Sequence, residues 1–193
     1  METTLLTASP AGYPEWLKSV KDRIRAAQQK AVIAANSAMI ILYWQIGRDI
    51  LERQEKQGWG AKVVDRLAQD LQREFPEIKG FSSSNLKYMR RFAEECPDRQ
   101  IGQQPVDQLP WSHIINLITR VDAPHEREWY ARGAIEYGWS RAVLVHQIES
   151  GLYHRQGEAI TNFDRRLPSP QSELAQQTLK DPYMFDFLGI GKE

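Results

Sequence analysis

A helical pattern of unusual length occupies the first third of the chain and constrains the fold more than any other feature. Hydrophobic residues recur every three or four positions, and no proline or glycine interrupts them between Glu15 and Ile46. A helix unbroken to Glu55 would be about 60 Å long at ~1.5 Å per residue, whereas a compact domain of this size is about 35 Å across. The repeating positions are Leu17, Val20, Ile24, Ala27, Ala31, Ala35, Met39, Leu42, Ile46 and Ile50.

Two structures are compatible with this pattern. The helix can break, with 28–29 as the candidate position, and form two core helices that meet at a kink. Alternatively, it stays unbroken and projects from the domain, in which case its hydrophobic seam makes it a candidate for dimerisation. The pattern alone leaves both open.

The remainder of the chain predicts further helices and little strand, so the expected fold class is all-α. A second helix is expected at 61–74, and a basic helix follows after Gly80. This pair has the outline of a helix-turn-helix, and a second such outline runs over 122–153. The best candidate for a minor β-hairpin is 160–163. The hydrophobic face of the second helix consists of Val64, Leu67, Ala68, Leu71 and Phe75.

Three regions are expected along the chain. Residues 1–13 are a flexible lead-in, and 14–160 form a helical domain with helix-turn-helix-like units. Residues 161–193 are a linker with short helices, because 167–170 reads Leu-Pro-Ser-Pro and the glycine-containing end has the composition of an interdomain linker. We expect a further domain to follow.

Composition excludes several classes of protein. The 25 basic and 25 acidic residues give a formal net charge of zero, so a nucleic-acid surface can only be a local patch. The one cysteine, Cys96, excludes a disulfide framework and a cysteine zinc site within one chain and fits a reducing cytoplasm. No hydrophobic run approaches the ~20 residues that span a bilayer, and the N-terminus has no signal-peptide pattern. A cytoplasmic protein without membrane contact is expected.

A candidate patch lies at 78–93, a stretch without an acidic residue. At 100° per residue its hydrophobic side chains fall on one side of a helix and its serine and cationic side chains on the other, as in a recognition helix. Lysine and arginine would bind phosphates, Asn85 and Arg91 could read adenine and guanine edges, and Tyr88 could stack on a base. A solvated amphipathic helix is the alternative. The predicted nucleic-acid-binding residues here are Lys79, Ser82, Ser83, Ser84, Asn85, Lys87, Tyr88, Arg90 and Arg91.

Two further phosphate contacts are predicted at helix N-termini, where unpaired N–H groups point outward. They are Ser112 with His113, and Ser140 with Arg141. In each pair a serine is expected to cap a helix beside an aromatic residue and a side chain that can carry positive charge. The alternative is that these residues serve capping and core packing alone.

No catalytic motif stands out. The four histidines lack zinc-ligand spacing, and glycine-rich phosphate loops and a Gly-x-Ser-x-Gly elbow are absent from the sequence. Residues 77–79, Glu-Ile-Lys, have the form of the last part of the PD-(D/E)xK nuclease signature. They lie in a turn between expected helices, however, and not on a strand beside a second carboxylate. We therefore expect no catalysis, metal or cofactor in this chain.

Several short segments form an ordered series from about residue 20 to 188. They include LYWQIG at 42–47, WGAKVVDRLA at 59–68, LKYMR at 86–90, QLPWSH at 108–113 and GWSR at 138–141. This series resembles the N-terminal domain of the YhcG family of PD-(D/E)xK nuclease domain-containing proteins. The resemblance implies a bacterial protein with a helical, DNA-binding domain, followed in cis by a nuclease domain that would hold the divalent metal.

The predicted function is therefore non-catalytic. The domain is expected to bind DNA, to target the nuclease domain in cis, and to form a homodimer through its long N-terminal helix. The alternative is a protein-interaction or oligomerisation module that binds no nucleic acid. The zero net charge favours the alternative and the local patch favours DNA. The outward face of the basic helix at 84–91 is here called the cationic ridge. If this ridge is buried or neutralised by carboxylates, the DNA prediction loses its basis and the assembly role remains.

Overall fold

The computed structural model describes residues 10–58, 60–97, 105–155 and 170–188, and within these ranges it contains helices and no strand. This confirms the all-α prediction, while the predicted hairpin at 160–163 lies outside the described residues. Among these helices, none combines the length and the apolar character that a bilayer crossing requires. The elements in order are α1 (Tyr13–Gln57), α2 (Ala61–Glu74), η1 (Lys79–Phe81), α3 (Ser83–Glu95), η2 (Pro105–Gln108), α4 (Trp111–Arg120), α5 (Pro124–Glu136), α6 (Arg141–Glu149), α7 (Leu152–Arg155), α8 (Pro170–Leu179) and α9 (Pro182–Leu188).

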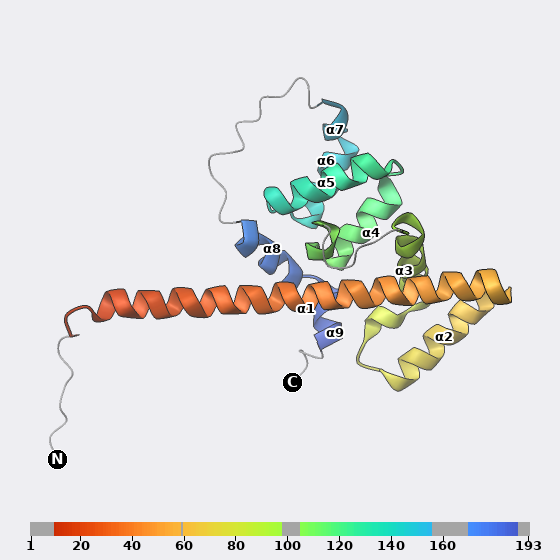
Figure 1. Cartoon of the computed structure of the whole chain (residues 1–193), viewed down its shortest axis with the longest axis horizontal. Coiled ribbons are helices and arrows are strands. Elements are labelled where there is room, and N and C mark those ends of the chain that lie inside the picture. Colours follow the sequence, from red (N-terminus) through yellow and green to blue (C-terminus); the bar gives the residue numbers. More distant parts are fainter. Residues whose placement is uncertain (1–9, 59, 98–104, 156–169, 189–193) are drawn as a thin grey trace, which may run out of the picture.

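α1 is one unbroken helix of 45 residues, about 68 Å long at ~1.5 Å per residue. It begins after Gly12, which has a φ of 81°, with Pro14 in the first turn. It ends at Gly58, whose N–H donates to the carbonyl of Gln54. The break considered at 28–29 does not occur, and Figure 1 shows the N-terminal part of α1 extending beyond the other helices.

The buried residues of α1 all lie in its C-terminal half, from Asn36 to Ile50. Along its length α1 packs on α3, α8 and η2. None of residues 13–31, here called the arm, is buried. α1 is therefore both the central helix of the body and a rod that leaves it (Figure 1).

Aromatic side chains from α1, α3 and α4 form the centre of the core. Trp111 is fully buried, and its ring lies 5.1 Å from that of Tyr43 and 5.5 Å from that of Phe92, both edge-on, the arrangement that aromatic quadrupoles favour. The indole N–H of Trp111 donates to the Oδ1 of Asn85 (2.7 Å), so the polar end of the buried ring is satisfied. These contacts fix α3 between α1 and α4.

α1 and α3 approach each other closely at Gly47. A Cβ atom at this position would clash with the carbonyl oxygen of Met89 and lie 3.0 Å from the Cβ of Ala93, so only glycine lets the two backbones come this close. The contact fixes the rotation of α1 about its own axis. It thereby fixes the direction in which the side chains of the arm point.

The last two helices pack back on the body. Leu174 of α8 and Met184 of α9 are buried, α8 lies against α1, and α9 lies against η1. The carboxylate of Asp181 accepts a hydrogen bond from the backbone N–H of Ser112 at the start of α4 (2.8 Å). The sequence prediction assigned 161–193 to a linker region, whereas the helices within it belong to the same packed body as α1 to α7.

Candidate functional site

The start of α3 forms as the sequence predicts. Ser82 is the N-cap, and its Oγ accepts a hydrogen bond from the N–H of Asn85 (3.3 Å). Leu86 and Met89 are fully buried, while Ser84 and Lys87 are exposed. α3 therefore presents one face to the core and one to solvent.

Asn85 does not belong to the outer face of α3. Its side chain is 1% exposed, its Nδ2 donates to the carbonyl of Gly80, and its Oδ1 accepts from Trp111. Because the side chain is buried and both ends of its amide are hydrogen-bonded inside the core, Asn85 cannot reach a base, and that prediction is wrong. A buried indole needs an acceptor, and Asn85 supplies it.

His113 is also buried, with 2% of its surface exposed, and its Nε2 donates to the carbonyl of Trp139 (2.8 Å). Burial lowers the pKa of His113 below its usual value, against the raising effect of that hydrogen bond. The ring is therefore neutral near pH 7. The predicted phosphate contact is wrong for this residue, which is neither exposed nor charged.

The N-terminus of α4 is not free to bind phosphate. Pro110, rather than Ser112, is the N-cap, and the N–H of Ser112 donates to the carboxylate of Asp181. A side chain of the protein thus occupies the place of an anion at this helix N-terminus.

The second predicted helix cap, at the start of α6, forms as predicted. The Oγ of Ser140 accepts a hydrogen bond from the backbone N–H of Val143, and Arg141 is exposed.

Asp65 of α2 lies against the outer face of α3. Its carboxylate accepts a hydrogen bond from the hydroxyl of Ser83 and lies 3.6 Å from the Nζ of Lys87. The Ser83 hydrogen bond is the main cause, and the charge of Lys87 the second, of a pKa for Asp65 below its usual value. Asp65 is therefore ionised and cancels the charge of Lys87.

Two glutamates match the two arginines of α3. Arg90 lies 4.0 Å from Glu94, and Arg91 lies 3.9 Å from Glu95, at the i,i+4 spacing that brings helical side chains together. Glu95 also forms a shorter ion pair (2.8 Å) with the buried Arg127. Exposed pairs of this kind contribute little stability, but they remove much of the positive field that phosphate binding requires.

Lys79 and Tyr88 complete the predicted nucleic-acid surface. Lys79 is exposed in η1, and Tyr88 is half-buried on α3. The three cations of α3 lie within 4.0 Å of three carboxylates. Because Glu95 is shared with Arg127, these carboxylates offset most but not all of the positive charge of the ridge, and Lys79 adds one positive charge at its end.

Residues 77–79, the Glu-Ile-Lys sequence, lie between α2 and α3, as predicted, with Lys79 beginning η1. A metal-dependent nuclease needs several carboxylates fixed around an ion. In the part of the chain that the structure describes, no three His, Cys, Asp or Glu side chains gather closely enough to hold a metal.

The arm carries a row of hydrophobic side chains on one side. Ile24 is 52% exposed and Tyr13 39% exposed, and Trp16, which contacts Tyr13 from just outside the row, is 59% exposed. Such a row on a surface helix is normally covered by a core or a partner. At 100° per residue, its members fall within about 40° of one line along the helix, and we call them the arm stripe. They are Tyr13, Leu17, Val20, Ile24, Ala27 and Ala31.

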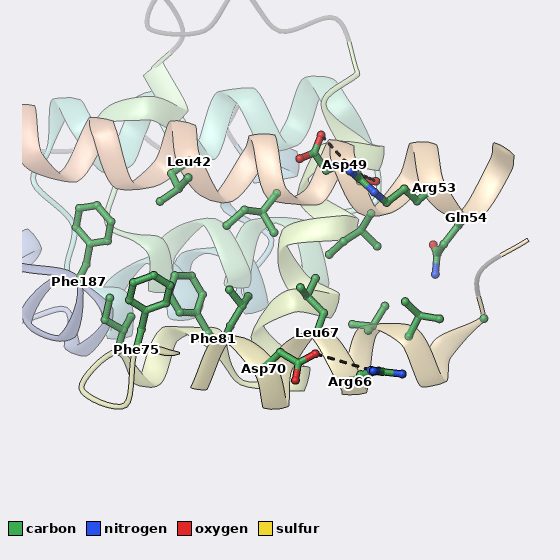
Figure 2. Close-up of a pocket in the computed structure, with 17 residues that line it drawn as sticks. Leu42, Asp49, Arg53, Gln54, Arg66, Leu67, Asp70, Phe75, Phe81 and Phe187 are labelled. Atoms are coloured by element: carbon green, nitrogen blue, oxygen red, sulfur yellow. Dashed lines mark hydrogen bonds and ion pairs between the residues drawn. The ribbon is translucent and has the colours of Figure 1, made fainter. Parts of the chain in front are cut away.

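A hydrophobic groove opens between the C-terminal half of α1 and α2 (Figure 2), with a volume of about 740 Å³. Two ion pairs lie at its rim, one between Asp49 and Arg53 (3.9 Å) and one between Arg66 and Asp70 (3.8 Å). Its hydrophobic lining consists of Leu42, Ile46, Ile50, Val63, Val64, Leu67, Leu71, Phe75, Ile78, Phe81 and Phe187.

The sequence analysis identified the hydrophobic face of α2 but did not predict that part of it lines a groove. Val64 and Ala68 are buried there, but Leu67 and Leu71 are only half-buried, and Phe75 is 45% exposed. The available signal was the length of that face, which runs over the whole of α2 and continues past its end.

The chain is similar to proteins of one family. A family model described as "DUF1016 N-terminal domain" matches residues 19–155. The chain is 24% identical over 225 residues to a protein of Escherichia coli (strain K12) named "Putative nuclease YhcG", and the match covers 98% of this chain and 60% of that protein. The chain thus spans about three fifths of the length of this relative. No solved structure matches the chain.

Proposed function

The chain belongs to the DUF1016 N-terminal domain family, and on that premise we propose that this domain assembles two copies of a nuclease-related protein through the arm of α1. The arm stripe carries the proposal, because it exposes large hydrophobic side chains on a helix that extends beyond the body. A helix of this kind is stabilised by pairing its hydrophobic face with another helix.

The nuclease context comes from the relative. The protein named "Putative nuclease YhcG" is longer than the region matched here, which is 60% of its length. We propose that a nuclease domain follows this domain in the same polypeptide. Pairing two such polypeptides would place two nuclease domains together.

Light scattering coupled to size-exclusion chromatography tests the assembly. One chain has a mass of 22.3 kDa, and we expect twice that mass at micromolar concentration. Ile24→Glu, which places a charge in the arm stripe, should give the single-chain mass. Ala26→Glu is the matched control, because Ala26 is exposed on the opposite side of the arm, and it should leave the dimer intact. A wild-type chain that is a monomer at ~100 μM, a concentration at which even weak pairs form, would refute the proposal.

DNA binding is not part of the proposed function. Its support was a cationic ridge, and that ridge is matched by carboxylates, while Asn85 and His113 lie in the core. An electrophoretic shift with random duplex tests the remaining possibility directly. Binding that weakens steeply with salt and is lost in the double variant Lys87→Ala, Arg91→Ala would restore DNA binding as a function.

A further inference from the structure

We propose that the arm of each copy lies in the groove between α1 and α2 of a second copy, so that the two α1 helices run antiparallel across a two-fold axis at Ala35. This inference rests on the proposed function and makes it specific, because it names the surface that receives the arm. The arm of the second copy fills the groove, and the groove in turn covers the arm stripe.

The arm stripe and the groove lie on the same side of α1. At 100° per residue, the groove residues Leu42 and Ile46 fall within about 60° of the arm stripe, whereas the buried Ile40 and Gly47 lie about 160–180° away. One hydrophobic seam therefore runs along α1. It is open along the arm and is joined by α2 at the groove.

The seam is symmetrical in sequence about Ala35. Ile24 and Ile46 lie eleven residues before and after it, and Leu17 and the rim residue Arg53 lie eighteen residues before and after it. Eleven and eighteen residues are close to three and five full turns of a helix with about 3.6 residues per turn. All five residues therefore fall near one line on the surface of α1.

A two-fold interface requires one surface that is complementary to itself. If two α1 helices cross antiparallel at Ala35, Ile24 of each copy reaches Ile46 in the groove of the other. The projecting arm and the receiving groove lie at equal distances from the crossing, so both contacts form together. The two distances are equal because Ile24 and Ile46 lie the same number of residues from Ala35. The pairing therefore needs no conformational change in either chain.

The crossing point itself carries small side chains. Ala31, Ala34 and Ala38 are exposed, and Ala35 is half-buried. Alanine at these positions allows two helix backbones to approach without a large side chain between them. Larger residues occur on either side of this alanine segment, where the arm and the groove begin.

The groove has the chemistry of a helix-binding site. Its floor is hydrophobic, its polar groups lie at the rim (Figure 2), and the arm offers Leu17, Val20 and Ile24 at the i, i+3, i+7 spacing that helix-in-groove recognition uses. The arm cannot fill its own groove. Because α1 is unbroken, Ile24 and Ile46 of one chain are about 33 Å apart along the helix.

Disulfide trapping tests the register. In a Cys96→Ser background, a mixture of Ile24→Cys chains and Ile46→Cys chains should form a covalent dimer on mild oxidation, because a disulfide needs Cα atoms within about 7 Å. Neither chain should cross-link with itself, and Ala35→Cys alone should. Ala26→Cys mixed with Ile46→Cys is the matched control and should stay uncross-linked, since Ala26 faces away from the stripe.

The outcomes separate this inference from the proposed function. Self-cross-linking of Ile24→Cys would show arms paired with arms, and a dimer without the mixed cross-link would show a different register. Either result overturns the groove and leaves the dimer. A single-chain mass in light scattering overturns both.

A groove variant gives independent evidence. Val63 lines the groove from α2 and is half-buried, whereas Gln69 is exposed and outside the groove. We expect Val63→Glu to raise the dimer dissociation constant at least tenfold and Gln69→Glu to leave it unchanged, with circular dichroism verifying that both variants are folded. A dimer of wild-type affinity in folded Val63→Glu would overturn the inference. A tightly bound small molecule in the groove of a monomer, detected by native mass spectrometry, would also overturn it.

Discussion

At the residue scale, Gly47 determines how α1 lies on α3, because any side chain there would clash with the backbone of Met89. We expect Gly47→Ala to reduce the free energy of unfolding by about 2 kcal/mol or more, since the backbone it meets cannot move aside. Urea denaturation followed by circular dichroism measures this. Gly60→Ala is the control, because a Cβ there meets nothing within 4 Å. An equal loss in both variants would contradict the argument.

Burial of His113 makes the stability of the fold depend on pH. Its pKa is lowered in the folded state, so the unfolded chain binds the proton more readily, and the stability is lost as pH falls below the unfolded value of about 6.5. We expect the free energy of unfolding to fall between pH 7 and pH 5. His113→Gln should reduce this fall, because glutamine can still donate to the carbonyl of Trp139 without titrating.

Denaturant titrations at several pH values measure the slope. His146 is exposed, so His146→Gln should keep the wild-type pH dependence. A His113→Gln variant with the same slope as the wild type would show that another group causes the effect.

Only some of the contacts made by α3 side chains could be predicted from the sequence. Glu94 and Glu95 follow Arg90 and Arg91 at i,i+4 spacing, so their pairing could be predicted from position alone. Asp65 could not, because it comes from another helix. The burial of Asn85 and His113 was equally hidden, since it depends on tryptophans 26 positions further along the chain.

At the element scale, α1 couples the arm to the body through one continuous helix. Inserting one alanine between Gln28 and Gln29 would turn the N-terminal part of the arm stripe by about 100° relative to the groove. We expect the dimer dissociation constant to rise at least tenfold, as measured by sedimentation, with the body still folded. Gln28→Ala, which keeps the length, should retain the dimer. Unchanged affinity after the insertion would mean that the direction of the stripe does not matter.

The helices themselves were largely predictable, and their arrangement was not. Hydrophobic periodicity placed α1, α2 and α3 correctly. The same periodicity fits a broken and an unbroken α1, and the alanines of 26–38 favour continuity, since alanine is the best helix former. The long hydrophobic face of α2 was visible in the sequence, but the groove itself was not, because it depends on how far α2 diverges from α1.

At the scale of the whole molecule, assembly links stability to concentration. If folded chains pair and unfolded chains do not, the midpoint of thermal unfolding rises with protein concentration. We expect the midpoint to rise by several degrees between about 1 and 100 μM chain, and Ile24→Glu to show no such rise. Differential scanning calorimetry at several concentrations provides the measurement. A wild-type midpoint independent of concentration would contradict the dimer.

Where the packed body ends along the chain was harder to predict than the helices that it contains. The proline-rich sequence at 167–170 favours a linker, so α8 and α9 were assigned to a region outside the domain. Their place in the core depends on contacts such as that between Asp181 and Ser112, which join residues 69 positions apart and leave no periodic signal in the sequence.

Because α1 has no joint, it can serve as a molecular ruler. In an antiparallel pair, the number of residues between the crossing and the body sets the spacing of the two bodies, in steps of about 3 Å for each residue added to both chains. The same additions rotate one body against the other. A family that varied the length of this helix would thereby alter both the separation and the relative orientation of the domains attached to it.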